Sequence, residues 1–211
     1  MPSVLPATRW MIRDPSKPPS EASLYRVLIL DTLLPVMVKD SDVYVLSGLL
    51  AHDGAWSYRS LAERLRVPHP VVQRALERAK GADLYSVDRR EVHLPHFEEF
   101  ALHALRFVAP SRLGALTPGM PAAWAAEPMA GAIRSSGDEP PPVWPFALGR
   151  VRGQAIEPLH PAAPEAVENW PELGEVLALL DSLRAGDARV RKVAGDFLSK
   201  MLRERSVVAG R

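Results

Sequence analysis

Residues 57–81 read SYRSLAERLRVPHPVVQRALERAKG, and this stretch carries the clearest helical pattern in the chain. Ser57 is a suitable N-cap for a first helix, and Gly81 is a suitable end for a second. The apolar residues of the first helix share one face: Leu61, Ala62 and Leu65. Those of the second do the same: Val71, Val72, Ala75, Leu76 and Ala79. The spacing predicts two amphipathic helices separated by a break at Arg66-Val67-Pro68.

The break has the residue types of a helix-turn-helix. Two helices that cross steeply on a short turn need a small residue in the first helix, and Ala62 stands there. An apolar residue must fill the turn, which Val67 does, and the β-branched Val72 packs back from the second helix. Arg66 occupies the position where glycine is usual. We expect it to adopt the turn conformation at some cost in strain.

The flanking sequence extends this unit in both directions. Val43–Ala51 is an apolar run that predicts a preceding helix, and Asp53-Gly54 predicts a turn. After Gly81, Tyr85–Val87 and Val92–Leu94 predict two short strands around residues 88–91. Such a strand pair after a helix-turn-helix would form its wing.

The segments Tyr58–Leu65 and Val72–Leu76, with Val67 between them, resemble the winged-helix regulators of the multiple-antibiotic-resistance-regulator type. The resemblance covers residues 38–108 and implies a DNA-binding transcriptional regulator. The segments Pro140–Pro145 and Gly149–Gly153 are similar to uncharacterised bacterial proteins, a likeness that implies no function.

In a helix-turn-helix the N-terminal residues of the second helix meet base edges in the major groove. The residues expected there are His69, Pro70, Gln73 and Arg74. Gln pairs with adenine and Arg with guanine through two hydrogen bonds each. The residues expected near phosphates are Arg59, Arg78 and Lys80, and those expected at the wing tip are Arg89 and Arg90. Several arginines could instead pair with Glu63 and Glu77 on a solvated helix face.

Composition excludes several other functions. Residues 56–93 hold eight Lys or Arg and five Asp or Glu, a balance of 8 − 5 = +3, whereas the whole chain carries +1. The chain has no cysteine, which excludes disulfides, thiolate metal sites and cysteine nucleophiles. No common nucleotide-binding or hydrolase motif occurs. His96 and His103 lie two helical turns apart with Glu99 between them, but packed or exposed histidines are commoner than metal sites. We therefore expect no catalytic residue, no metal and no cofactor.

The rest of the chain differs in composition. Residues 1–20 read as a flexible arm ahead of a winged helix-turn-helix domain at 21–108. Residues 109–171 hold twelve of the 21 prolines together with many large apolar residues. We expect this Pro/Trp-rich half to be an irregular cover over the helices at 21–34, 95–108 and 172–205, with Trp144 as its anchor. Residues 172–211 predict a helical hairpin, in which Gly186 ends one helix and Asp187 caps the next.

The sequence thus predicts a mainly α fold with a small β wing: a winged helix-turn-helix, an irregular Pro-rich wrap and a C-terminal helical hairpin. The function expected is a sequence-specific repressor that binds double-stranded DNA as a homodimer. The alternative is an antitoxin-like or other interaction module that binds a protein partner through its Pro/Trp-rich half. No export signal is evident, and the longest apolar stretch is broken by Asp31 and Pro35, so we expect a cytoplasmic protein without a membrane span.

Overall fold

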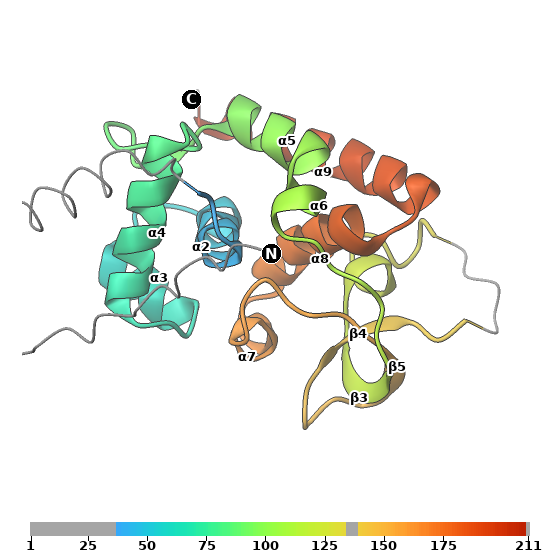
Figure 1. The fold of residues 1–211 in the computed structure, drawn as a ribbon. Coiled ribbons are helices and arrows are strands. Elements are labelled where there is room, and N and C mark those ends of the chain that lie inside the picture. The colour runs from blue at the N-terminus through green and yellow to red at the C-terminus, as the bar shows by residue number, and fades with distance from the viewer. Residues whose placement is uncertain (1–36, 134–138, 210–211) are drawn as a thin grey trace, which may run out of the picture. The chain divides into compact units, whose positions relative to one another are not determined.

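The computed structural model describes residues 37–133 and 139–209. This part of the chain is mainly helical and holds a few short strands, in agreement with the expected fold class (Figure 1). One hydrophobic core runs from Val43 to Leu202. The expected arm at 1–20 and the expected contacts with 21–34 lie outside the described residues. None of the helices described combines the length and apolar composition that a bilayer span requires.

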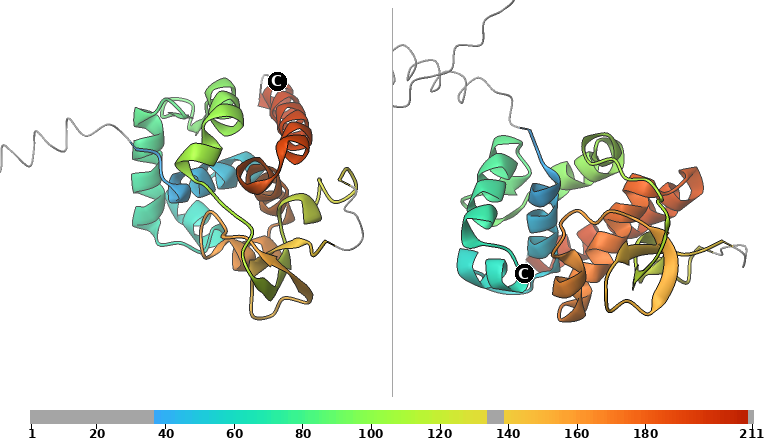
Figure 2. Two further views of the ribbon diagram at one scale, coloured as in Figure 1. Left: turned by 45° about the vertical axis from the view of Figure 1, so that its right-hand side comes forward. Right: turned by 60° about the horizontal axis from the view of Figure 1, so that its bottom comes forward.

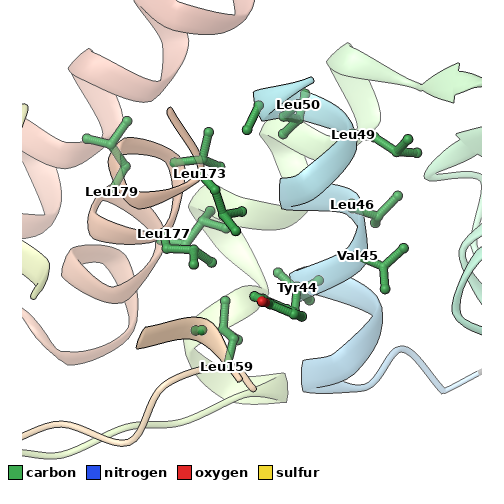
Figure 3. Packing of buried hydrophobic residues seen from close by; sticks show 14 of the residues in the cluster. Tyr44, Val45, Leu46, Leu49, Leu50, Leu159, Leu173, Leu177 and Leu179 are labelled. Atoms are coloured by element: carbon green, nitrogen blue, oxygen red, sulfur yellow. The ribbon is translucent and has the colours of Figure 1, made fainter. Parts of the chain in front are cut away.

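Helix α2 (Asp40–Ala51) lies at the centre of this core. Its residues from Asp42 to Ala51 are all buried, because α4 (His69–Gly81) packs on one side of it and α8 (Pro171–Ala185) on the other. Figure 3 shows Tyr44 directed towards the leucines of α8, whereas Val45 and Leu49 point away from them. The Tyr44 hydroxyl donates to the carbonyl of Leu65 at 3.0 Å, which ties α2 to the end of α3 (Tyr58–Arg64).

The two helices expected at 57–81 are present with the expected limits. Helix α3 begins after its N-cap Ser57, and α4 ends at Gly81. The strands β1 (Tyr85–Ser86) and β2 (Glu91–Val92) form an antiparallel pair. β1 ends one residue earlier than expected, and β2 begins one residue earlier and ends two residues earlier. Helices α5 (Leu94–His103) and α6 (Leu105–Val108) follow.

The Pro/Trp-rich half is more regular than the sequence predicts. Strands β3 (Leu116–Pro121), β4 (Pro142–Pro145) and β5 (Val151–Ala155) each pair with the other two, and the short helix η1 (Ala123–Ala125) follows β3. The expectation of an irregular segment is wrong here, since prolines at strand ends leave the ladder intact. Pro121 ends β3, and Pro142 and Pro145 are the first and last residues of β4, whereas Pro118 lies inside β3 opposite Arg152 of β5.

Glycines allow the three strands to approach one another. A Cβ atom at Gly119 would overlap the backbone of Trp144, and one at Gly153 would overlap the backbone of Pro141. The expectation that this half packs on helices is confirmed for α8, which η1 contacts directly. In Figures 1 and 2, α3 and α4 lie on one side of α2, and the strands β3–β5 lie beyond α8.

Helix α7 (Ala163–Glu168) leads into α8, and α9 (Ala188–Ala209) completes the described chain. The helices expected in the C-terminal stretch are therefore present. Asp187 accepts a hydrogen bond from the Val190 amide at 2.7 Å, as expected of an N-cap. Gly186 has a φ of −70°, so its role is steric: a Cβ there would collide with the Ser182 carbonyl and with Val190.

Trp144 is the anchor that the sequence predicts. Its side chain is 2 % exposed, and its Nε1 donates to Asp181 Oδ2 at 2.7 Å. Arg184 Nη1 donates to the other Asp181 oxygen at 2.5 Å, and Arg184 Nε donates to the Ala109 carbonyl at 2.7 Å. Burial raises the pKa of Asp181, which Arg184 and Trp144 oppose. This buried network joins β4, α8 and the segment after α6.

His160 is expected to make the stability of the fold depend on pH. Its ring stacks on Tyr44 with centroids 5.0 Å apart, and burial lowers its pKa below the ordinary value of 6.5. The folded state therefore binds fewer protons than the unfolded chain just below pH 6.5. The contribution of neutral His160 to the free energy of unfolding is complete above pH 6.5, and it is lost as the pH falls through the folded pKa.

The variant His160→Asn keeps an acceptor near the Ala162 amide but does not titrate there. Urea unfolding at about pH 7.5 and about pH 5.5 should show a smaller loss of stability on acidification for this variant than for wild type. The variant His103→Asn, at an exposed histidine, is the control. Equal losses in wild type and His160→Asn would contradict the expectation.

Candidate nucleic-acid interface

The candidate interface is built on α3, α4 and the segment between them. The predicted inner faces are buried except at Val71, which is half-buried. The buried residues are Leu61, Ala62 and Leu65 in or just after α3, and Val72, Ala75, Leu76 and Ala79 in α4. Val67, the residue expected to fill the turn, is 8 % exposed. These contacts fix α4 against α3 and α2, and they leave the opposite face of α4 exposed.

The segment between α3 and α4 closes as a Schellman motif. The Val67 amide donates to the Ala62 carbonyl at 3.0 Å, and the Arg66 amide donates to the Glu63 carbonyl at 3.2 Å. This motif requires a left-handed backbone at the residue after the C-cap, and Arg66 has a φ of +56°. The strained turn expected at Arg66 is thus present.

The side chains expected to meet base edges are all at the surface. His69 and Pro70 lie in the first turn of α4, and Gln73 and Arg74 follow one turn later; all four are exposed. Arg74 Nε donates to the Pro70 carbonyl at 3.2 Å, which leaves the guanidinium Nη atoms without a partner among the described residues. Arg59 and Lys80, expected near phosphates, are exposed as well.

Arg78 does not belong to this exposed set. Its Nε donates to Asp42 Oδ2 at 2.8 Å and its Nη2 donates to Asp42 Oδ1 at 2.5 Å. The Asp42 side chain is fully buried, so the pair holds α4 on α2. The hydrogen bond to Asp42 raises the pKa of Arg78 above its ordinary value. The expectation that Arg78 faces phosphates is therefore corrected: its charge is used inside the protein.

The β1–β2 hairpin, which stands where the wing is expected, places its two arginines differently. The side chain of Arg89 is 77 % exposed and lies 3.6 Å from Glu91. Arg90 turns back instead: its Nη2 donates to the Trp56 carbonyl at 3.2 Å, and its Cζ lies 4.7 Å from the centre of the Trp56 ring. Trp56 Nε1 donates to the Arg90 carbonyl at 3.0 Å. Arg90 therefore positions the wing, which corrects its expected place at the free tip.

Trp56 was not among the predicted site residues. Its indole also lies 5.4 Å from the ring of Tyr58, at the start of α3, and 6.5 Å from Tyr85 in β1. It thus joins the loop after α2 to both the wing and α3. An aromatic residue directly before the Ser57 cap is the one signal in the sequence that could have suggested this role.

Arg64 links α3 to the C-terminal helices. Its Cζ lies 3.6 Å from the centre of the Trp170 ring, just before α8, and its Nη1 lies 2.9 Å from His52 Nδ1. The pairing of arginines with Glu63 or Glu77 that the sequence left open is not observed in the described residues. With Arg78 paired internally, the balance over residues 56–93 falls to 7 − 5 = +2. The net positive charge of this segment is therefore small.

An open groove of about 660 Å³ lies beside the wing. Its walls include Leu49 in α2, Trp56, Arg90 in the wing, and Met201 and Arg205 in α9. Arg205 lies 3.5 Å from Asp53, whose side chain is 92 % exposed.

His96, one of the two histidines considered as metal ligands, contacts Asp83 and His93 instead. His96 Nδ1 lies 2.9 Å from the Asp83 carbonyl, and its ring stacks on His93 at 3.7 Å. In residues 37–133 and 139–209, no three His, Asp or Glu side chains converge as metal ligands.

Comparison with protein-family models, with curated proteins and with solved structures gives no match to this chain.

Proposed function

We propose that this protein is a sequence-specific DNA-binding transcriptional regulator that acts in the cytoplasm as a repressor and a homodimer. Its DNA-binding unit is a winged helix-turn-helix composed of α2, α3, α4 and the β1–β2 hairpin. The proposed mechanism is equilibrium binding without chemistry.

One observation carries this proposal: the combination of the α3–α4 turn with the exposed face of α4. The turn uses Ala62, Val67 and Val72 in the way that a helix-turn-helix requires, and each of them is buried. The side chains on the other face at the start of α4 are polar or small, and they are exposed. Gln73 and Arg74 on this face are residue types that can form paired hydrogen bonds with base edges.

The proposed contacts follow from the geometry of groove binding. The first two turns of α4 would enter the major groove, where Gln73 pairs with adenine and Arg74 with guanine. Arg59 and Lys80 would contact phosphates on either side. Arg89, the exposed arginine of the wing, would contact the backbone or minor groove, while Arg90 and Trp56 hold the hairpin in place.

The proposed dimer follows from the size of the site. One recognition helix reads only a few base pairs, too few to define a site in a genome. Two copies related by a two-fold axis would read a palindrome whose half-sites lie about one helical turn apart. Such a dimer on a promoter would exclude other proteins from it, which is the basis of repression.

Alanine variants of the reading residues test the proposal. Gln73→Ala and Arg74→Ala should each cost about 1–3 kcal/mol of binding free energy on a duplex selected from random sequences by the wild-type protein. Their affinity for random duplex should change little. Fluorescence anisotropy titrations measure both, and Arg189→Ala, at an exposed arginine in α9, is the matched control. Full specific affinity in both variants would exclude α4 as the reading helix.

A protein-interaction module is the second candidate. Three large apolar side chains in or near the Pro/Trp-rich half are exposed: Phe107 at 67 %, Leu116 at 50 % and Leu148 at 75 %. Exposed residues of this kind contribute to protein interfaces when they are contiguous. A folded protein with no measurable affinity for any duplex would favour this candidate over DNA binding.

A further inference from the structure

Arg66 adopts a backbone conformation that its residue type disfavours. Four non-glycine residues in the described part of the chain have positive φ: Arg66, Asp83, Arg90 and Ala123. For a residue with a Cβ this conformation is unfavourable, and strain of this kind clusters at functional sites.

The side chains of two of the others have visible uses. Asp83 Oδ2 lies 3.0 Å from His96 Nδ1, and Asp is among the residues that tolerate this region. Arg90 bonds and stacks with Trp56. The fourth, Ala123, is fully buried and begins η1.

Arg66 differs because its side chain makes no contact in the described structure that would stabilise the fold. It is exposed, and it makes no hydrogen bond, ion pair or aromatic contact with any described residue, including Glu63 three positions earlier. The backbone bonds of the turn come from its amide, which glycine would supply equally well. Glycine would also remove the strain. The stability of the turn therefore gives no reason for an arginine here.

We propose that Arg66 contacts a phosphate of the DNA backbone beside the base pairs read by α4. This inference rests on the proposed function. Arg66 lies two residues before Pro68, the N-cap of α4, so it is next to the end of the helix that would enter the groove. An exposed guanidinium that pairs with no side chain in the described part of the chain can form two hydrogen bonds with a phosphate. Arg66 would thus replace Arg78 among the residues proposed to contact phosphates.

A phosphate contact has a signature that strain alone does not. It acts on every DNA sequence alike, and its loss makes the negative slope of log affinity against log salt smaller in magnitude by about 0.9. At about 0.15 M salt this corresponds to roughly fivefold weaker binding. Removing the arginine should at the same time leave the melting temperature unchanged or raise it.

The test compares Arg66→Gly, Arg66→Asn and Arg66→Lys in the full chain. The probe is a random-sequence duplex of about 30 base pairs, long enough for two half-sites. Anisotropy titrations between about 50 and 200 mM salt give the slope, and thermal melts give the stability. We expect Arg66→Gly and Arg66→Asn to bind the duplex more weakly than wild type and with a smaller salt dependence. Their melting temperatures should be no lower than that of wild type. Arg66→Lys should retain most of both, and Arg189→Ala should behave as wild type.

Each other result decides against the proposal. Unchanged affinity and slope in Arg66→Gly would show that Arg66 contacts no phosphate. A lower melting temperature for Arg66→Gly would show that the side chain supports the fold. If wild-type protein itself binds no duplex, the proposed function fails and this inference fails with it, whereas failure at Arg66 alone leaves the proposed function standing.

Discussion

Trp144→Ala is expected to lower the free energy of unfolding of the whole protein by about 3–5 kcal/mol. The indole is 2 % exposed and lies in β4, where it connects the three-stranded sheet to α8. Its loss would leave a large cavity and would also remove the N–H donor that Asp181 accepts at 2.7 Å. Because domains are stable by only about 5–15 kcal/mol, the loss is a large share of the total.

Urea unfolding and thermal melts measure this effect. Trp144→Phe keeps most of the ring volume but not the donor, so its loss should be smaller than that of Trp144→Ala. Leu148→Ala changes a residue of the same half that is 75 % exposed and should shift stability by less than about 0.5 kcal/mol. An unshifted melt for Trp144→Ala would mean that this half is not an integral part of the fold.

Arg184→Met is expected to cost about 3–5 kcal/mol as well, because it leaves a buried carboxylate without its counter-charge. Both side chains of the Arg184–Asp181 pair are 1 % exposed. The substitution would also take a donor from the carbonyls of Ala109 and Glu157, which Arg184 reaches at 2.7 and 3.3 Å. Methionine fills a similar volume, so the loss reports on charge and hydrogen bonding more than on packing.

A double-mutant cycle separates the ion pair from the rest of the network. Adding Asp181→Asn to Arg184→Met removes the uncompensated charge and should recover part of the lost stability, measured by urea unfolding. Arg78→Met offers a comparison, since the Arg78 side chain is 28 % exposed and Asp42 keeps the Lys39 amide as a donor at 2.9 Å. It should cost less than Arg184→Met. Simple additivity of Asp181→Asn and Arg184→Met would contradict the coupling.

The helices of this fold follow from local sequence patterns. The apolar spacing from Leu61 to Ala79 and the Ser57 cap are short-range signals, and α3 and α4 begin and end where they predict. The three-stranded sheet of β3, β4 and β5 was not predicted, because its pairing is non-local: Gly119 in β3 pairs with Pro145 in β4. The prolines suggested irregular structure, but they stand mostly at strand ends, where their missing N–H does no harm.

The candidate site divides in the same way. Exposure of Gln73 and Arg74 follows from helical periodicity alone. The placement of Arg78 and Arg90 does not, because their partners Asp42 and Trp56 lie 36 and 34 residues earlier in the chain. A Lys or Arg side chain on a predicted outer face can bind a ligand only if it is not paired with a residue far away in the sequence. Sequence spacing does not reveal such pairing.

The most direct test of the DNA-binding proposal is to select duplexes from a random-sequence library with the purified full chain. The enriched duplex and a random one are then titrated by anisotropy at about 0.15 M salt. We predict that one palindromic sequence is enriched and bound at least about 10³-fold more tightly than random DNA, with affinity falling steeply as salt rises. Absence of an enriched sequence, with equal or no binding of the two duplexes by folded protein, would contradict the account.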